Sequence, residues 1–204
     1  MVDTATLKRV GGRIFFIDPK STECVRFYDE NGKEIKSVKA GDMPFYYKVT
    51  RRKKGESPKF WVYNANIANW RRWMPFSAKY EKHDTVTSFG SGFFNTDTIM
   101  HETDYSKDEN TIWGELRKRN EQSEFGCNDW FVPSKDEALV MRDFFKEAKA
   151  TLGLVDPFDL TWLWLSSEIS STCAWFWGCD GQDFDGSNQR TATTLFFLSG
   201  LSKA

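Results

Sequence analysis

The chain has 204 residues, of which 40% are hydrophobic, and a formal net charge of -1. This length suits one domain with a sizeable core. The near-neutral charge argues against a nucleic-acid partner, which normally needs a basic excess, and the basic residues 51–54 read as a solvated turn. No apolar run approaches the ~20 residues of a membrane span. The N-terminus lacks a signal-peptide pattern, so we expect synthesis in the cytoplasm.

Cysteines and aromatic residues add two further expectations. The four cysteines form no C-x-x-C pair, and we expect reduced thiols, with a Cys173–Cys179 disulfide as the alternative. Nine Trp and eighteen Phe are many for this length. Some of them must fill the core, but aromatic side chains are also common on binding surfaces.

The first third of the chain predicts strands. Residues 13–18, 24–28, 43–50 and 59–64 are rich in β-branched and aromatic side chains. Asn31-Gly32 follows the second of these runs and is a strong two-residue hairpin signal, because both residues tolerate positive φ. Residues 65–110 are less regular. Within them, "FGSGFFN" predicts tight-turn backbone, and His83 and His101 predict surface positions.

Two helices are expected next. Ile112, Trp113 and Leu116 form a one-sided apolar stripe, and Glu115 stands four residues before Arg119. Ser134 and Glu137 form a capping box that opens the second helix. The apolar face of that helix is expected at Ala138, Met141, Phe145 and Ala148. After Pro157 the chain returns to short strands and loops, so we expect one α+β domain over 1–204.

Catalytic motifs are missing from the sequence. It contains no G-x-S-x-G, no H-E-x-x-H and no phosphate-binding glycine loop, and we predict neither an enzyme nor a cofactor. Asp180, Asp183 and Asp185 do not follow the EF-hand pattern; an irregular calcium site there stays an alternative. Glu168 is interpreted as a structural carboxylate, with a general acid or base as the alternative.

Several segments resemble a known family. "VGGRIFF", "FGSGFFNTDTIM", "TIWGELRKRN", "GCNDWFVPSKDEA" and "WLSSEISSTCAWFW" occur in the order found in gut-bacterial and phage proteins with a C-type-lectin-like fold. These are related to the C-terminal domain of Lcl-type surface proteins and to formylglycine-generating enzymes. Several look like variable proteins of diversity-generating retroelements, in which a C-terminal segment is rewritten at template adenines. Leu165 stands where the family usually has serine, and the final strand lacks its usual arginine.

The resemblance makes a prediction about residue types. Template codons AAC or AAT, randomised at both adenines, become pyrimidine-ending codons that never encode Lys, Glu, Gln, Met or Trp. Residues 161–202 contain no Lys and no Met. Some residues of this segment are of types that these codons cannot encode, and we call them unreachable. The resemblance implies that four of them are fixed scaffold: Trp164, Glu168, Trp175 and Trp177.

The segment 161–194 is therefore the expected variable, ligand-binding part of the domain. Trp175 and Trp177 are two residues apart on an expected strand, so we expect both on one face and at least partly buried. The positions expected to vary are Ile169, Thr172, Cys173, Gly178, Cys179, Asp180, Gly181, Asp183, Phe184, Asp185, Gly186 and Ser187.

The implied function is non-enzymatic recognition of a protein or glycan on a cell surface, by a monomer or an oligomer displayed on a phage particle. An undiversified lectin-like domain and a virion structural component are alternatives. An enzyme on this scaffold would need a reactive cysteine pair, for which Cys173 and Cys179 are the candidates.

Overall fold

The structure is a computed structural model. It describes residues 2–3, 23–28, 34–35, 37–38, 46–51, 59–64, 71–88, 90–123, 128–153, 162–177, 184–188, 195–196 and 198–202. The chain divides into two compact units. The first comprises residues 1–66, 141–157 and 199–204, and the second comprises residues 67–140 and 158–198. Both helix and strand are present, as expected of an α+β protein, and the expectation of one domain stays a prediction.

The first unit is built on antiparallel strands. β2 (Glu23–Tyr28), β5 (Tyr46–Arg51) and β6 (Lys59–Asn64) form a meander in which Val25 lies opposite Val49, and Val49 opposite Trp61. β3 (Glu34–Ile35) pairs antiparallel with β2, with Tyr28 opposite Glu34, whereas the two-residue turn predicted at Asn31-Gly32 stays a prediction. The turn residues, and the strand predicted at 13–18, lie outside the described residues.

The remaining strands of this unit are short. β1 (Val2–Asp3) pairs with β4 (Ser37–Val38), and β12 (Leu198–Ser202) follows β6 in the sheet order. The chain crosses from the second unit to the first within α3 (Lys135–Leu152). No described helix is long and apolar enough to cross a lipid bilayer.

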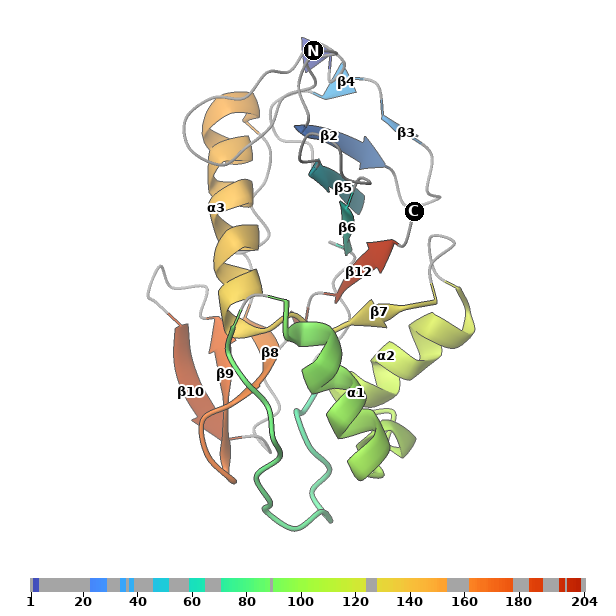
Figure 1. Cartoon of the computed structure of the whole chain (residues 1–204), viewed down its shortest axis with the longest axis vertical. Helices are drawn as coiled ribbons and strands as arrows, with labels where there is room; N and C mark the ends of the chain where they lie inside the picture. Colours follow the sequence, from blue (N-terminus) through green and yellow to red (C-terminus); the bar gives the residue numbers. More distant parts are fainter. Residues whose placement is uncertain are drawn as a thin grey trace. The chain divides into compact units, whose positions relative to one another are not determined.

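The second unit combines helices with a four-stranded sheet. Its sheet order is β10-β9-β8-β11, from β8 (Leu163–Glu168), β9 (Cys173–Trp177), β10 (Phe184–Asn188) and β11 (Leu195–Phe196). β8 and β9 lie side by side at its centre (Figure 1). Its other elements are α1 (Gly92–Glu102), the 3-10 turn η2 (Tyr105–Lys107), α2 (Ile112–Glu121) and β7 (Trp130–Phe131).

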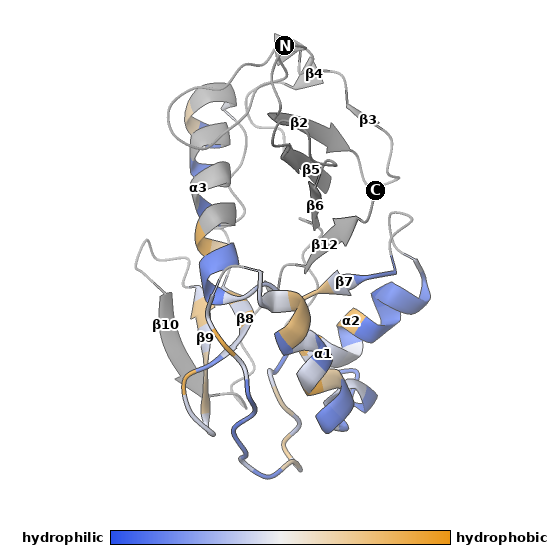
Figure 2. Cartoon of the chain, viewed as in Figure 1, coloured by the Kyte–Doolittle hydropathy of each residue, from blue (hydrophilic) through white to orange (hydrophobic). Residues whose placement is uncertain are grey.

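Both predicted helices are present. Ile112, Trp113 and Leu116 are fully buried, and Arg119 donates to Glu115 at 3.2 Å, as the spacing predicted. The rest of α2 is hydrophilic (Figure 2). The capping box that opens α3 also forms, and Ala138 is buried as predicted. The other three residues of the predicted apolar face have no described side chains.

A third helix, α1, contradicts the tight-turn prediction for "FGSGFFN". Gly90 does occupy a turn, with φ +90°, but the helix starts two residues later at Gly92. Its buried residues are Gly92, Asn95, Thr96 and Ile99, whereas Phe94 is 69% exposed. Because the buried face is mostly small or polar, the sequence carries no apolar period from which to predict a helix.

The surface prediction for His83 is wrong. Its side chain is 8% exposed, its ring packs edge-on against Tyr105 at 5.9 Å, and its Nδ1 lies 3.4 Å from Glu102. His101 is exposed, as predicted.

Candidate functional site

Three of the four predicted scaffold residues are buried in the four-stranded sheet of the second unit. Trp164, Trp177 and Glu168 are 0%, 4% and 5% exposed, and every residue of β8 is buried. Trp164 and Trp177 lie on neighbouring strands, with Trp177 opposite Leu163. Trp175, the fourth, is only partly buried and shares a face of β9 with Trp177, as its spacing predicted.

Indole rings tie β8 to the segment that precedes α1. Trp164 donates through Nε1 to the carbonyl of Arg71 at 3.2 Å, and Trp73 donates to the carbonyl of Leu165 at 2.8 Å. Trp73 also packs edge-on against Trp113 at 5.1 Å. The two hydrogen bonds join residues more than 90 positions apart in sequence, so the strand cannot shift without breaking them.

Glu168 ends β8 with its carboxylate inside the fold. Its Oε2 accepts from the backbone N–H of His83 at 2.8 Å and from the hydroxyl of Thr85 at 3.2 Å. The backbone N–H of Glu168 in turn donates to Thr85 Oγ1 at 2.9 Å. These contacts favour the structural interpretation of Glu168, because they satisfy both the side chain and the backbone where the strand gives way to the turn.

Asn95 of α1 fixes loop 83–88 at Val86, the residue that follows Thr85. Its amide accepts from the N–H of Val86 at 2.9 Å and donates to the carbonyl of Val86 at 2.7 Å and to Ser166 Oγ at 3.1 Å. Ser167 also donates to the Val86 carbonyl, at 2.9 Å. Loop 83–88 is thus held from two sides, by α1 and by β8.

Glu137 completes this buried polar cluster at the start of α3. Its Oε2 accepts from the backbone N–H groups of Ser134 at 2.8 Å and Gly92 at 3.1 Å. Burial raises the pKa of Glu137, and the hydrogen bonds from Ser134, Gly92 and Gly90 oppose that rise. A Cβ at position 92 would stand 2.2 Å from the same carboxylate oxygen, so only glycine fits there.

The turn between β8 and β9, together with the first residue of β9, holds three of the predicted variable positions. Ile169 is 39% exposed, and Thr172 and Cys173 are partly exposed. The turn is closed by backbone bonds from Ile169 and Ser170 to the Cys173 carbonyl, at 2.8 and 3.1 Å. Ser170 Oγ accepts from the N–H groups of Thr172 and Cys173, both at 3.2 Å. Cys173 carries a free thiol.

Four more predicted variable positions lie on β10. Its backbone pairs with β9 so that Phe184, Asp185, Gly186 and Ser187 stand opposite Trp177, Phe176, Trp175 and Ala174. Gly178, Cys179, Asp180, Gly181 and Asp183 lie outside the described residues, so the calcium alternative, which needs Asp180 and Asp183, stays an alternative. Among the described side chains, no three metal-ligating groups gather.

Trp175 differs from the other scaffold residues in its contacts. The Nζ of Lys135, the first residue of α3, lies 3.5 Å from the centre of the Trp175 ring. The backbone N–H of Lys135 donates to Ser167 Oγ at 3.2 Å, which fixes the start of α3 against β8. Both side chains are partly exposed.

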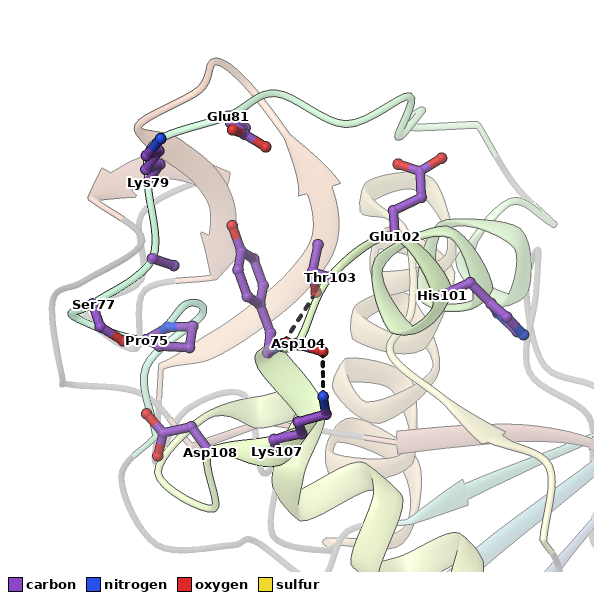
Figure 3. A pocket seen from close by; sticks show the side chains of 12 residues that line it. Pro75, Ser77, Lys79, Glu81, His101, Glu102, Thr103, Asp104, Lys107 and Asp108 are labelled. Atoms are coloured by element: carbon purple, nitrogen blue, oxygen red, sulfur yellow. Dashed lines mark hydrogen bonds and ion pairs between the residues drawn. The ribbon is translucent and has the colours of Figure 1, made fainter.

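An open cavity of about 730 Å³ lies elsewhere in this unit, near α1 and η2 (Figure 3). Lys107 pairs with Asp104 at 2.7 Å, and Asp108 pairs with Arg72 at 3.1 Å. Burial would raise the pKa of Asp108, but hydrogen bonds from Asn110 and Arg72 hold it below its ordinary value. Three charged residues that line the cavity, Asp104, Lys107 and Asp108, are therefore already paired within the fold. None of the predicted site residues lines this cavity.

Sequence reasoning identified Glu168 but missed its partners. Thr85 and Asn95 were not singled out, and they meet β8 across more than 70 residues of chain. Nothing local marks such positions, because a threonine in a loop and an asparagine in a helix are ordinary surface residues.

Comparisons with family models, with curated proteins and with solved structures found no match to this chain.

Proposed function

We propose that this chain is a non-enzymatic binding protein with a C-type-lectin-like fold, whose segment 161–194 is diversified by a retroelement to recognise varied targets. The target is a protein or a glycan on a cell surface. Diversification would act on the codons of the twelve predicted variable positions. The residues that pyrimidine-ending codons cannot encode would supply the permanent framework.

One observation carries the proposal. The unreachable residues Trp164, Glu168 and Trp177 are buried, whereas the reachable Ile169 and Thr172 lie exposed or partly exposed in the turn that directly follows. The hairpin thus divides its predicted framework from its predicted variable positions by burial, except at Trp175, which is partly exposed like Thr172 and Cys173. A diversified hairpin requires such a division, because a variable codon in the core would unfold most variants.

The hydrogen bonds explain how such a surface would tolerate change. The backbone of the turn is held by backbone groups and by Ser170 Oγ, and the Thr172 hydroxyl contacts only side-chain atoms, Ser170 Oγ at 3.3 Å and Cys173 Sγ at 3.6 Å. Glu168 and loop 83–88 hold the end of β8 from beneath. A new side chain at either turn position would therefore alter the chemistry of the surface without breaking the contacts that hold the backbone.

A library experiment tests the proposal. The twelve variable codons are replaced by any-any-pyrimidine codons, the library is displayed on yeast, and clones are selected on two probes, acidic ovalbumin and basic lysozyme. We expect folded clones that bind each probe selectively. A library that stays folded but yields no binder to either probe would contradict the binding function.

The genetic part of the proposal has its own test. Sequencing around the gene should reveal a reverse transcriptase and a near-copy of the 3′ coding end, with adenines at the variable codons. A near-copy without adenines at those codons, or the absence of both elements, would favour the undiversified lectin-like domain.

A further inference from the structure

Trp175 and Lys135 form a pair that the framework role alone does not explain. Trp73 and Trp164 both donate their indole N–H groups to backbone carbonyls within the fold. For Trp175, the structure contains no hydrogen bond from Nε1 among the described residues, and that nitrogen is not one of their buried unsatisfied atoms. The Trp175 ring is thus partly exposed with an available donor at its edge.

The ammonium group of Lys135 is likewise available to a ligand. Lys135 Nζ stands 3.5 Å above the ring, in the geometry of a cation–π contact. It makes no ion pair with any described carboxylate. The ammonium and the indole N–H therefore present two donors, and no acceptor, at one place on the surface.

This place adjoins the predicted variable positions. Trp175 lies two residues after Cys173 on β9, and Gly186 of β10 stands directly opposite it in the register. Lys135 is bound to Ser167 through its backbone, so the start of α3 keeps its position whatever residues the variable codons encode.

We propose that Trp175 and Lys135 are a fixed contact element of the ligand-binding surface, and that they bind a carboxylate on a protein ligand. The inference rests on the proposed function. A carboxylate is the acceptor that matches this pair: one oxygen accepts from the indole N–H, and the negative charge lies beside the ammonium. Tryptophan is also the residue type most enriched among energetically dominant interface contacts. Every variant would then share one anchor for a carboxylate, and the variable positions would select among the surfaces that surround it.

The test uses the ovalbumin-binding clones of the library described above. In each clone, Trp175→Phe removes the indole N–H but keeps an aromatic ring, and Lys135→Met removes the charge but keeps most of the aliphatic chain. Lys135→Arg keeps the charge. Lys118→Met is the matched control, because Lys118 is an exposed residue of α2. Affinity and thermal stability are measured for each, on ovalbumin and on ovalbumin whose carboxyl groups have been amidated.

We expect Trp175→Phe and Lys135→Met each to weaken binding to ovalbumin by about tenfold. Lys135→Arg and the control should bind as the parent does. On the amidated protein, binding of the parent should already be weakened, and Lys135→Met should weaken it no further, because the two changes remove the same interaction.

Unchanged affinity in folded Trp175→Phe and Lys135→Met variants would overturn the inference and leave the proposed function standing. A loss with Trp175→Phe alone, without any effect of Lys135→Met or amidation, would overturn the carboxylate assignment. A folded library without binders would instead contradict the proposed function, and the inference with it.

Discussion

The side-chain amide of Asn95 pairs with both backbone polar groups of Val86, accepting from its N–H at 2.9 Å and donating to its carbonyl at 2.7 Å. Asn95 is 1% exposed, and it reaches Ser166 of β8 as well. A single buried amide thus replaces the ladder partner that loop 83–88 lacks. The predicted binding hairpin is thus held rigid by residues that are far from it in sequence.

Replacing Asn95 should therefore destabilise the second unit. Asn95→Leu leaves the Val86 N–H and the Ser166 hydroxyl without their partner and removes one of the donors to the Val86 carbonyl, and we expect a loss of about 2–3 kcal/mol. Urea denaturation followed by tryptophan fluorescence measures it. Asn128→Leu is the control, because Asn128 is exposed and its replacement should cost less than about 0.5 kcal/mol. Equal effects of the two substitutions would contradict this role for Asn95.

Gly92 should not tolerate a methyl group. A Cβ there would lie 2.2 Å from Glu137 Oε2 and 2.8 Å from the Ser134 nitrogen, so both α1 and the start of α3 would have to shift. We expect Gly92→Ala to lower the unfolding free energy by about 1–3 kcal/mol. A Cβ at position 90 would meet no atom within 4 Å, so Gly90→Ala measures the cost of a positive φ without a steric clash. A wild-type melting temperature for Gly92→Ala would show that the close contact is not maintained in solution.

The stability of the protein should depend on pH through Glu137. Its pKa is raised in the folded state, mainly by burial, so the folded protein binds this proton more tightly than the unfolded chain does. The contribution of this group to stability is thus greatest below its ordinary pKa of 4.5 and falls as the pH rises through the folded-state value.

Glu137→Gln should remove this dependence. The difference in unfolding free energy between wild type and variant should shift in favour of wild type as the pH is lowered, by at most about 1.4 kcal/mol per pH unit. Glu109→Gln, at an exposed position, is the control. A difference that stays constant between pH 7 and pH 4 would contradict the assignment.

Framework and turn should respond to substitution very differently. Trp164→Ala removes a fully buried ring and its hydrogen bond to Arg71, and should cost about 3–5 kcal/mol. Ile169→Ser changes a side chain that is 39% exposed, and should cost less than about 1 kcal/mol. Chemical denaturation of both variants measures the contrast. A large loss for Ile169→Ser would place that residue in the framework.

The elements that could be predicted from the sequence are those with strong local signals. The capping box of Ser134 and Glu137 and the apolar stripe of α2 each depend on residues within one or two helical turns, and both are confirmed. Helix α1 was not predicted, because Ile99 is the one aliphatic residue of its buried face and the other three are Gly92, Asn95 and Thr96. His83 was wrongly assigned to the surface, since its cover comes from Tyr105, 22 residues later.

The candidate site was inferred from residue type, not from a local structural signal. Under the proposed function, the absence of lysine and methionine from residues 161–202 reflects codon chemistry. It separated Trp164 and Glu168 from Ile169 and Thr172 correctly with respect to burial. Thr85 and Lys135 could not be found in this way, because they lie outside the segment and meet it only in the folded chain.

The most direct measurement compares two displayed libraries under protease challenge. One randomises four predicted variable positions, Ile169, Thr172, Phe184 and Asp185, with any-any-pyrimidine codons, and the other does the same at Trp164, Glu168, Trp175 and Trp177. If a buried framework supports an interchangeable surface, most clones of the first library and almost none of the second should resist proteolysis. Similar surviving fractions in the two libraries would contradict the account.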